Sequence, residues 1–380
     1  MKVLHIGKFY PPFSGGIETF MADLLPELTK LGAQQLALVH DHQKPLTLFP
    51  EIKPDSQFPF VYRAPCYGRL LYAPISPHFP FLFHHLLKNF KPDLLHFHVP
   101  NTSVFWFFIL AKKYKIPYVV HWHADVVSST IEKSLALAYK VYRPFEQHLL
   151  KNSKAIIATS PTYLKASPAL KNWEEKCRVI PLGLNPQRLP VPTQDALNWA
   201  KEKWGETDFR ILHIGRLTYY KGQSYLLQAV SQISNVKLLL VGEGELKENL
   251  IQNKPKNVEL LGRCSDEQVA ALLSTCEAFC LPSIERTEAF GMVLLEAMNY
   301  SKPLIVNKML DSGMSWVAGN ASLKCEIGNI DDLKQAIIKL RDNPDLRNHL
   351  GQLGNQRLQQ EFHISQIAQQ IKQLYVDILG

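Results

Sequence analysis

The sequence predicts an α/β protein with two Rossmann-like domains that face a central cleft. Short apolar segments alternate with amphipathic ones throughout both halves of the chain. With 380 residues the chain is too long for one ordinary core. A polar, proline-bearing stretch at 185–208 separates the two alternating sets. We therefore expect a first domain over 1–188, a second over 205–360, and an amphipathic terminal helix over 363–380.

In the first half, a helix is expected over 17–32. Each expected strand is a short apolar run that ends at polar or small residues. The expected strands are MKVLHIG (1–7), QQLALVH (34–40), DLLHFHV (93–99), PYVVHWHAD (117–125), KAIIATS (154–160) and VIPLGLN (179–185). Residues 63–93, rich in Pro, His and aromatic residues, fit no regular period. We expect this segment to be a lid or a surface-docking element.

In the second half, strands and helices again alternate at the spacing of parallel βαβ units. The expected strands are FRILHIG (209–215), VKLLLVG (236–242), VELLG (258–262), AFCLPS (278–283) and KPLIVN (302–307). Helices are expected over 222–234, 245–252, 266–275 and 290–300. Since the carboxyl ends of both sheets should border the cleft, the chemistry is expected in the loops that follow these strands.

The composition is that of an ordinary soluble globular protein, with 46% hydrophobic and 20% charged residues. No run approaches the roughly 18 apolar residues that would span a bilayer, and the N-terminus is typical of a strand and not of a signal peptide. The six cysteines lack paired spacing, which favours buried thiols in a reducing compartment.

The positive charge is concentrated in the first half. Residues 1–190 contain 22 Lys and Arg against 12 Asp and Glu, whereas residues 191–380 contain 20 against 22. A basic half suits an anionic partner such as a membrane surface, a phosphorylated lipid or nucleic acid. A basic solvated surface without a partner explains the charge equally well.

Two loops carry groups suited to phosphate. Gly15 and Gly16 directly precede a helix, so bare backbone amides and a helix N-terminus occur together there. The G-x-G-x-x-G spacing of a dinucleotide site is absent. In the second half, Arg216 and Lys221 stand between a strand and a helix, where two cations could neutralise a diphosphate. Taken singly, each loop could equally be a turn or a pair of solvated cations.

The stretch 287-TEAFGMVLLEAM-298 holds two glutamates. Glu296 stands in an apolar run, where a carboxylate is costly to bury without hydrogen-bond donors. Glu288 precedes the expected helix, and the amide of Gly291 at its start could face an anion. Two carboxylates so placed could accept hydrogen bonds from the hydroxyls of a sugar and of a ribose joined by a diphosphate.

Two H-x-H pairs, His96 with His98 and His121 with His123, lie at the ends of expected strands. Because alternate strand residues face the same way, a four-histidine metal site is conceivable. We favour the alternative that no metal is bound. Asp125 is either a contact to an acceptor substrate or the cap of the next helix.

The order and spacing of these motifs resemble the family 4 glycosyltransferases, retaining enzymes of the GT-B architecture. The similarity runs through YPPFSGGIE, VVHWHAD, ATSPTY, VIPLGLN, HIGRLTYYKG, VGEGE, LGRCSDEQ and TEAFGMVLLEAM, which together span nearly the whole chain. Ser301 stands where family members often have a glycine, so the resemblance does not name the donor sugar.

The resemblance implies roles for individual residues. Glu288 would bind hydroxyls of the donor sugar and Glu296 the ribose, while Arg216 and Lys221 would hold the diphosphate with help from the Gly15 and Gly16 amides. It also places Gly262 and Arg263 near the base, and Ala289, Phe290 and Gly291 beside the donor. His123 would face the reacting centre, so the catalytic set would be His123, Glu288, Arg216 and Lys221. His121 and Asp125 are candidate acceptor contacts. His96 and His98 would be packing or acceptor-side residues, and the terminal helix would cross back to the first domain.

The expected activity is transfer of a hexose, with retention, from a nucleoside-diphosphate sugar to a glycan or a lipid-linked glycan in cell-surface polysaccharide or lipopolysaccharide synthesis. GDP-mannose is favoured as donor, with UDP-hexoses as the alternative. We expect no metal, no cofactor beyond the nucleotide sugar as substrate, and no nucleic-acid partner. The expected location is cytoplasmic, peripheral on the anionic inner face of the plasma membrane. Two other classes remain open: another GT-B enzyme such as a nucleotide-sugar epimerase, and a non-catalytic nucleotide-sugar-binding protein.

Overall fold

The computed structural model describes residues 1–43, 53–70, 73–126 and 133–380. The chain divides into two compact units. Unit 1 comprises Met1–Gly183 together with Ile364–Gly380, and unit 2 comprises Leu184–His363.

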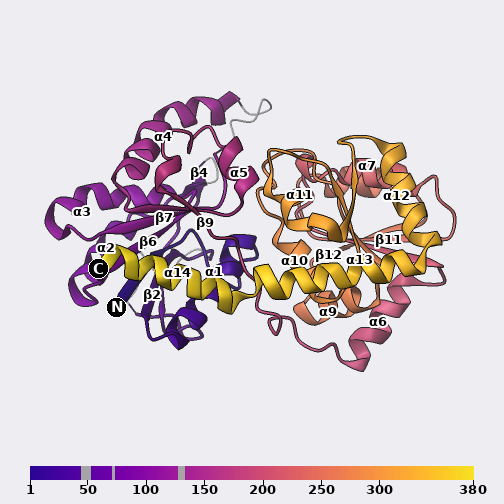
Figure 1. The fold of residues 1–380 in the computed structure, drawn as a ribbon, viewed down its shortest axis with the longest axis horizontal. Coiled ribbons are helices and arrows are strands. Elements are labelled where there is room, and N and C mark those ends of the chain that lie inside the picture. Colours follow the sequence, from indigo (N-terminus) through magenta and orange to yellow (C-terminus); the bar gives the residue numbers. More distant parts are fainter. Residues whose placement is uncertain (44–52, 71–72, 127–132) are drawn as a thin grey trace. The chain divides into compact units, whose positions relative to one another are not determined.

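Unit 1 is built on a parallel sheet with the strand order β3-β2-β1-β6-β7-β8-β9 (Figure 1). Its strands are β1 (Lys2–Ile6), β2 (Gln34–His40), β3 (Val61–Ala64), β6 (Leu94–Val99), β7 (Tyr118–Trp122), β8 (Ala155–Ala158) and β9 (Cys177–Val179). Every residue of β6, β7 and β8 is buried. Burial on both faces is the rule for parallel strands covered by helices, and it explains why these segments are apolar runs without alternation.

The helices of unit 1 connect and cover these strands. They are α1 (Gly16–Lys30), α2 (Phe79–Asn89), α3 (Phe107–Tyr114), α4 (Lys133–Asn152), α5 (Pro161–Ala166) and α14 (Ile364–Leu379), with the short 3-10 turns η1 (Thr102–Trp106) and η2 (Glu174–Lys176). Among the described residues, no helix is both long and apolar enough to cross a bilayer.

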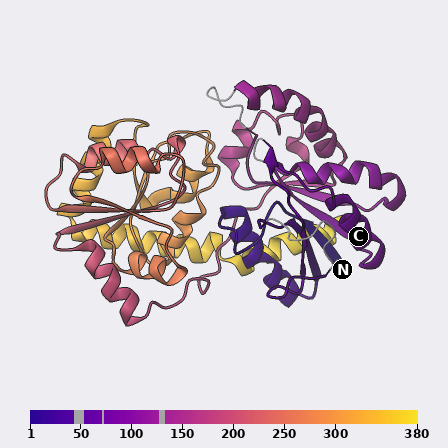
Figure 2. The same ribbon diagram turned by 180° about the vertical axis from the view of Figure 1, so that it is seen from behind.

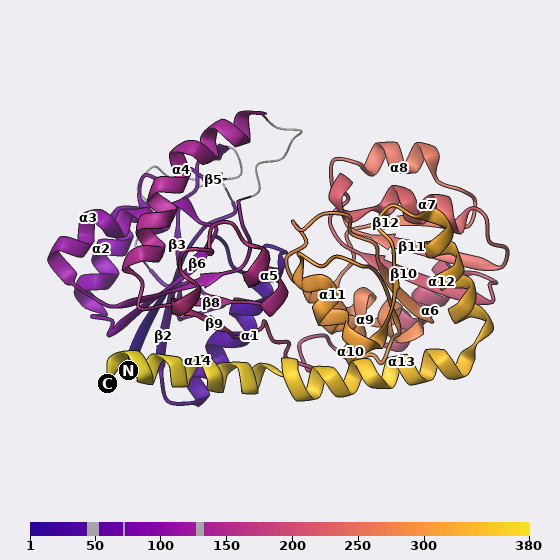
Figure 3. The same ribbon diagram turned by 45° about the horizontal axis from the view of Figure 1, so that its top comes forward.

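Helix α14, the last of the chain, lies along α1 within unit 1 (Figure 3). Its buried residues include Ile364, Ile367, Ile371 and Tyr375. The spacing of three or four residues places them on one side of the helix. The C-terminal segment thus completes the core of the unit that contains the N-terminus.

The segment 63–93, which fits no regular period in the sequence and is expected to be a lid or a surface-docking element, contains regular structure. It begins in β3, continues through the small antiparallel pair β4 (Arg69–Leu70) and β5 (Ala73–Pro74), and ends in α2. Five residues of α2, Phe79 among them, are buried. The apolar run FPFLF at 79–83 obscured the helical period, because it includes Phe81, which is 70% exposed.

Unit 2 contains a second parallel sheet, with the order β12-β11-β10-β13-β14-β15 and helices on both of its faces (Figure 2). The strands are β10 (Phe209–Ile214), β11 (Val236–Val241), β12 (Val258–Gly262), β13 (Ala278–Leu281), β14 (Leu304–Asn307) and β15 (Ser322–Cys325). The helices are α6 (Gln194–Trp204), α7 (Gln223–Val230), α8 (Lys247–Asn253), α9 (Asp266–Thr275), α10 (Met292–Asn299), α11 (Gly313–Ala318), α12 (Ile330–Asp342) and α13 (Pro344–Arg357). The predicted α/β class with two Rossmann-like sheets is confirmed.

Two segments of unit 2 differ from expectation. The stretch 185–208, predicted as a polar separator, contains α6, whose Ala196, Ala200 and Trp204 are buried and which packs beside α9. Thr193 caps this helix by accepting a hydrogen bond from the Ala196 amide. The edge strand β15 was not predicted, because SLKC carries only a weak alternating pattern.

Candidate functional site

The candidate site begins at the carboxyl ends of the central strands β10 and β13 of unit 2. The loop after β10 contains Arg216 and Lys221, and the loop after β13 leads through Glu288 to α10. The two loops are joined by a hydrogen bond of 2.7 Å from the Ile284 amide to the Tyr220 carbonyl. At Gly222, with φ of 73°, an added Cβ would lie 2.1 Å from the Pro282 carbonyl oxygen. A glycine is therefore required for these loops to approach so closely.

Lys221 and Glu288 form a buried ion pair across these two loops. Each residue is less than a tenth exposed. The Ser283 hydroxyl donates to the Glu288 carboxylate at 3.3 Å, and the Ser312 hydroxyl donates to the Glu288 carbonyl oxygen. A shielded ammonium beside a carboxylate offers a phosphate-binding cation and a hydroxyl-binding acceptor in one place.

Arg216, in contrast, is half exposed and pairs with Glu245 at 3.2 Å. The 241-VGEGE-245 turn packs against the backbone of this loop. Added Cβ atoms at Gly242 and Gly244 would lie 2.0 and 2.1 Å from the carbonyl oxygens of Gly215 and Leu217. These two glycines are therefore explained by close backbone packing, and the Arg216 guanidinium stays on the solvent side, able to meet a ligand.

Glu296 lies one helical turn into α10, and its carboxylate pairs with Arg188. Burial raises the pKa of Glu296, and the Arg188 charge opposes that rise. The costly carboxylate of the apolar run is thus compensated within unit 2 by a guanidinium that precedes α6.

The other predicted donor-side positions of unit 2 are backbone sites. Gly262 has φ of 67°, and an added Cβ there would lie 2.8 Å from the Glu243 carboxylate. Arg263 is exposed, whereas Ala289 and Phe290 are buried. Gly291, with φ of 80°, is the N-cap of α10. No side chain caps this end, so the first amides of α10 have no capping oxygen there.

In unit 1, Gly15 is the N-cap of α1 and Gly16 its first residue. An added Cβ at Gly15 would lie 2.2 Å from the Glu18 carboxylate, which folds back over this helix end. Burial raises the pKa of Glu18, while the charges of Lys8 and Arg69 oppose the rise. The structure therefore places a carboxylate of the chain itself against the position predicted for a phosphate.

The two H-x-H pairs come together on unit 1. His98 and His121 are register partners of β6 and β7. His123 follows the end of β7, and its ring stacks on that of His121 with centroids 4.2 Å apart. Burial lowers the pKa of His123 to about 3, and those of His96, His98 and His121 also lie well below the usual value. These rings are neutral at physiological pH.

Asp125 does not join the histidines. Its carboxylate accepts hydrogen bonds from Trp122 Nε1 at 2.8 Å and Ser167 Oγ at 2.6 Å, and its amide donates to the Tyr163 hydroxyl. The residues that lead into α4, 127–132, lie outside the described residues, so the predicted helix cap stays a prediction. In the structure Asp125 ties the end of β7 to α5.

Sequence reasoning missed Arg188. It also missed His5 and Tyr375, which contact the histidine pairs, and Gln35, which contacts His5. One signal was available. The tetrapeptide LHIG occurs at 4–7 and again at 212–215, and the first strand of each unit buries its histidine, His5 in β1 and His213 in β10. Nothing local in the sequence pairs Arg188 with Glu296, because 108 positions separate them.

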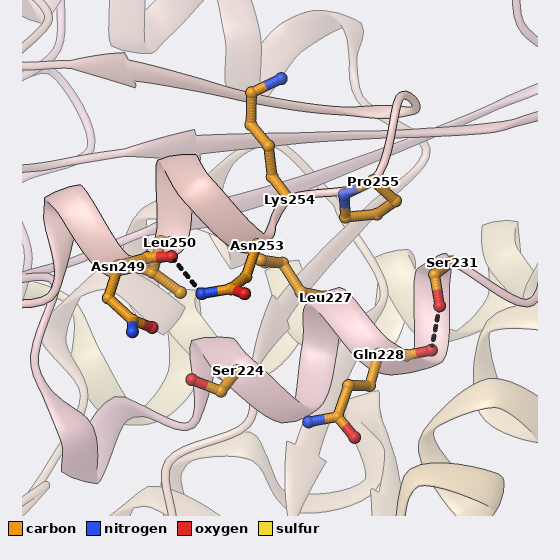
Figure 4. Close-up of a pocket in the computed structure, with 9 residues that line it drawn as sticks. All are labelled: Ser224, Leu227, Gln228, Ser231, Asn249, Leu250, Asn253, Lys254 and Pro255. Carbon is orange, nitrogen blue, oxygen red and sulfur yellow. Dashed lines mark hydrogen bonds between the residues drawn. The ribbon is translucent and has the colours of Figure 1, made fainter.

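A separate groove of about 420 Å³ lies between α7 and α8 (Figure 4). Its lining is Ser224, Leu227, Gln228, Ser231, Asn249, Leu250, Asn253, Lys254 and Pro255. None of the predicted site residues is in this lining. Two of its polar side chains, Asn253 and Ser231, donate to carbonyls of their own helices, so the groove presents no convergent set of ligand contacts.

Comparison with known proteins agrees with this architecture. The model of the glycosyl transferase 4-like domain matches residues 15–183, and that of the glycosyl transferases group 1 matches residues 196–357. D-rhamnosyltransferase WbpZ of Pseudomonas aeruginosa is 32% identical over 72% of this chain and 70% of its own. O-antigen chain mannosyltransferase C of Escherichia coli is 28% identical over 100% of this chain and 99% of its own. The chain belongs to the family 4-like glycosyltransferases of GT-B type.

Solved structures show the same fold. A sucrose-phosphate synthase from Thermosynechococcus elongatus superposes with a TM-score of 0.82 at 23% identity, covering 99% of this chain and 98% of that one. The Anabaena protein HepE in complex with UDP and glucose gives a TM-score of 0.75 at 18% identity, covering 99% and 100%. The resemblance to family 4 stated from the motifs is confirmed.

Proposed function

We propose that this protein is a retaining hexosyltransferase that acts in cell-surface polysaccharide synthesis. Its donor is a nucleoside-diphosphate sugar, and its acceptor is a glycan or a lipid-linked glycan. The observation that carries the proposal is the buried Lys221–Glu288 pair at the carboxyl ends of β10 and β13, the edge at which ligands bind in open α/β sheets.

The chemistry follows from these side chains. Lys221 and Arg216 neutralise the diphosphate as it leaves, which is the main electrostatic task of glycosyl transfer from such a donor. Glu288 accepts hydrogen bonds from sugar hydroxyls, and Glu296 accepts them from the ribose. The acceptor oxygen attacks from the face that the diphosphate leaves, and a phosphate oxygen takes the acceptor proton, so configuration is retained. With two cations at the diphosphate, this step needs no metal and no cofactor.

The choice of donor is supported by relatives. O-antigen chain mannosyltransferase C aligns with the whole chain, and a GDP-mannose-dependent phosphatidylinositol monomannoside mannosyltransferase of Corynebacterium glutamicum is 25% identical over 57% of it. We therefore favour GDP-mannose. HepE, crystallised with UDP-glucose, supports UDP-hexoses as the alternative at 19% identity.

The test is a thermal-shift panel with GDP-mannose, GDP, UDP-glucose and UDP, because a ligand of the folded state raises apparent stability with its occupancy. The true donor should raise the melting temperature and support transfer in EDTA, with the anomeric configuration of the product read by NMR. Glu288→Gln should lower the transfer rate about 100-fold or more. Glu326→Gln, at an exposed ion pair with Lys308 in the same unit, is the matched control and should leave transfer unchanged. Inversion at the anomeric carbon, loss of activity in EDTA, or normal turnover by Glu288→Gln would each contradict the proposal.

We also propose that unit 1 docks on an anionic leaflet through α4. Leu137, Val141 and Phe145 are 66%, 67% and 48% exposed. They are spaced four residues apart and therefore lie on one side of the helix. We call them the α4 stripe. Lys140 and Arg143 are exposed on the same helix.

The neighbouring helix extends this surface. Phe105 of η1 packs against Tyr142 and Phe145, so the start of α3 lies beside α4. Ile109 of α3 is 67% exposed, and Lys113 is exposed as well. Apolar side chains flanked by cations are typical of helices that lie in the interface of an anionic membrane. This placement would bring the enzyme to a lipid-linked acceptor on the inner face of the plasma membrane.

A further inference from the structure

Five buried histidines form one cluster on the sheet of unit 1. His5 on β1 is the register partner of His96 on β6, and His98 is that of His121 on β7. With His123 they share the sheet face that α1 and α14 cover, since Phe20 of α1 packs edge-on against His121 and Tyr375 of α14 against His96. Burial lowers the pKa of each ring, to about 4 for His5, so every ring is a neutral imidazole with one proton.

A first chain of hydrogen bonds runs from Gln35 to His123. Gln35 Oε1 lies 2.7 Å from His5 Nε2, His5 Nδ1 lies 3.0 Å from His98 Nε2, and His98 Nδ1 lies 2.9 Å from His123 Nε2. With the Gln35 amide oriented so that its oxygen faces His5, that oxygen can only accept, so His5 holds its proton on Nε2. Its bare Nδ1 then accepts from His98, and the bare Nδ1 of His98 accepts from His123. The order of donors leaves His123 with an unprotonated Nδ1.

A second chain begins at Tyr375 on α14. Its hydroxyl bonds to His96 Nδ1, and His96 Nε2 lies 3.1 Å from His121 Nδ1. The buried Tyr375 hydroxyl donates to His96 Nδ1, because a buried O–H needs an acceptor and this nitrogen is the partner that the structure gives it. His96 then carries its proton on Nε2 and donates to His121. The Nε2 of His121 is left as an N–H donor.

Each chain therefore ends at one ring nitrogen. Within the part of the chain that the structure describes, His123 Nδ1 and His121 Nε2 are the buried ring nitrogens of this cluster without a partner. We propose that Gln35, His5 and His98 are positioning residues that fix the tautomer of His123, and that Tyr375 and His96 fix that of His121. The end of β7 thereby carries an acceptor nitrogen on His123 and a donor N–H on His121, on two rings that stack on one another.

The same cluster contains two triads, His5–His96–His98 and His98–His121–His123, whose nitrogens lie close enough for a metal ion. A metal would need bare nitrogens that converge. Here the nitrogens that converge already bond to one another, so metal binding would break both chains. The hydrogen-bond order therefore favours the two positioning chains over a metal centre.

The consequence for catalysis rests on the proposed function. His123 faces the reacting centre as a hydrogen-bond acceptor and does not take a proton, since its pKa lies near 3. Its ring must nevertheless be held in one tautomer, because the other would present an N–H to the same group. The outer partners that orient metal-ligating histidines, which act on the ring in the same way, matter by about 10–100-fold.

The test is two-bond ¹H–¹⁵N NMR of the ligand-free, full-length chain labelled at histidine, which distinguishes bare from protonated ring nitrogens. All five rings should carry the proton on Nε2. Gln35→Leu removes the acceptor and should give His123 a mixed tautomer, whereas Gln35→Glu keeps an acceptor oxygen and should preserve the wild-type pattern. Tyr375→Phe keeps the ring but removes the donor, and it should mix the tautomers of His96 and His121 while leaving that of His123 unchanged. If Gln35→Leu fails to fold, Tyr375→Phe and Gln35→Glu still decide the order of donors.

Activity supplies a second readout. Gln35→Leu should lower kcat about tenfold with little change in the KM for the nucleotide sugar, and Gln35→Glu should restore kcat. A proton on Nδ1 of His123 in the wild type, unchanged tautomers in Gln35→Leu, or a stoichiometric metal ion in the purified protein would overturn the proposal. If the wild type transfers no sugar, the proposed function fails while the NMR spectra still decide the tautomers.

Discussion

At the residue scale, the two glutamates of the E-x7-E stretch are compensated by different cations. Glu288 meets Lys221 from the loop after β10, and Glu296 meets Arg188 from the segment before α6. A buried carboxylate is tolerated only when such partners replace its hydration. Both acids are thus held in place before any ligand arrives, which limits the reorganisation that donor binding requires.

The Glu296–Arg188 pair gives a pH-dependent prediction. The folded pKa of Glu296 lies above its ordinary value of 4.5. At a pH below 4.5 the Glu296 carboxyl is protonated in both the folded and the unfolded chain. As the pH rises above it, the unfolded chain ionises first, so the free energy of unfolding falls. Arg188→Ala removes the opposing charge and should raise this pKa further.

We therefore expect Arg188→Ala to lower the free energy of unfolding by about 1–3 kcal/mol at pH 7 and by clearly less at pH 4. Urea titrations of variant and wild type at both pH values measure the difference. The control repeats Arg188→Ala in a Glu296→Gln background. There the loss of unfolding free energy caused by Arg188→Ala should no longer depend on pH. An equal loss at both pH values would mean that Arg188 acts through packing and not through Glu296.

Sequence alone identified several side chains but not their partners. The E-x7-E stretch, Arg216 and Lys221 follow from local spacing, because each stands beside a strand end. The partners of these groups and of the histidines, such as Arg188 and Gln35, are brought in from other elements by the register of the strands and the path of the chain. Contacts of that kind have no local signature.

At the element scale, strands were easier to predict than helices with mixed faces. Apolar runs such as 94-LLHFHV-99 predict buried parallel strands. Helix α2 was missed because prolines and the exposed Phe81 interrupt the pattern of its buried residues, which are Phe79, Phe83 and three leucines. Ser301, noted as a departure from the family glycine, has φ of 53°, so this turn after α10 adopts the left-handed conformation that glycine prefers.

The α4 stripe yields a prediction at this scale. Replacing Leu137, Val141 and Phe145 together by Ser should lower the partition of the protein onto vesicles of phosphatidylglycerol and phosphatidylcholine at least tenfold. Each buried apolar side chain contributes about 1.5–3 kcal/mol, and about 1.4 kcal/mol corresponds to tenfold. Raising the salt concentration should weaken wild-type binding, because cations such as Lys140 are screened.

Vesicle co-sedimentation measures the partition. Val191→Ser in unit 2 is the matched control, since Val191 is 90% exposed and lies outside the stripe. Because Phe145 also packs against Phe105, a melting curve of the triple variant checks that lost binding does not reflect unfolding. Wild-type partition by the triple variant, or no partition of the wild type at low salt, would refute docking through α4.

At the scale of the whole molecule, the chain returns to its starting unit. Helix α14 packs on α1, and Lys372 donates to the Leu31 carbonyl at 2.6 Å. Tyr375 links the same helix to the histidine cluster. The terminal amphipathic pattern predicts a helix, but only the assembled fold shows that its apolar side covers the sheet of unit 1.

The stability of each unit should therefore respond to different ends of the sequence. Ile371 on α14 and Ile337 on α12 are both fully buried, the first in unit 1 and the second in unit 2. Ile371→Ala and Ile337→Ala remove the same atoms, and each should lower the free energy of unfolding by about 2–5 kcal/mol.

Amide hydrogen exchange shows which unit loses stability. Ile371→Ala should speed exchange in β1 and β6 and spare β10 and β13, although it lies only nine residues from the end of the chain, whereas Ile337→Ala should do the reverse. If either variant speeds amide exchange equally in both sheets, the chain unfolds as one cooperative body. Helix α14 would then not stabilise unit 1 alone.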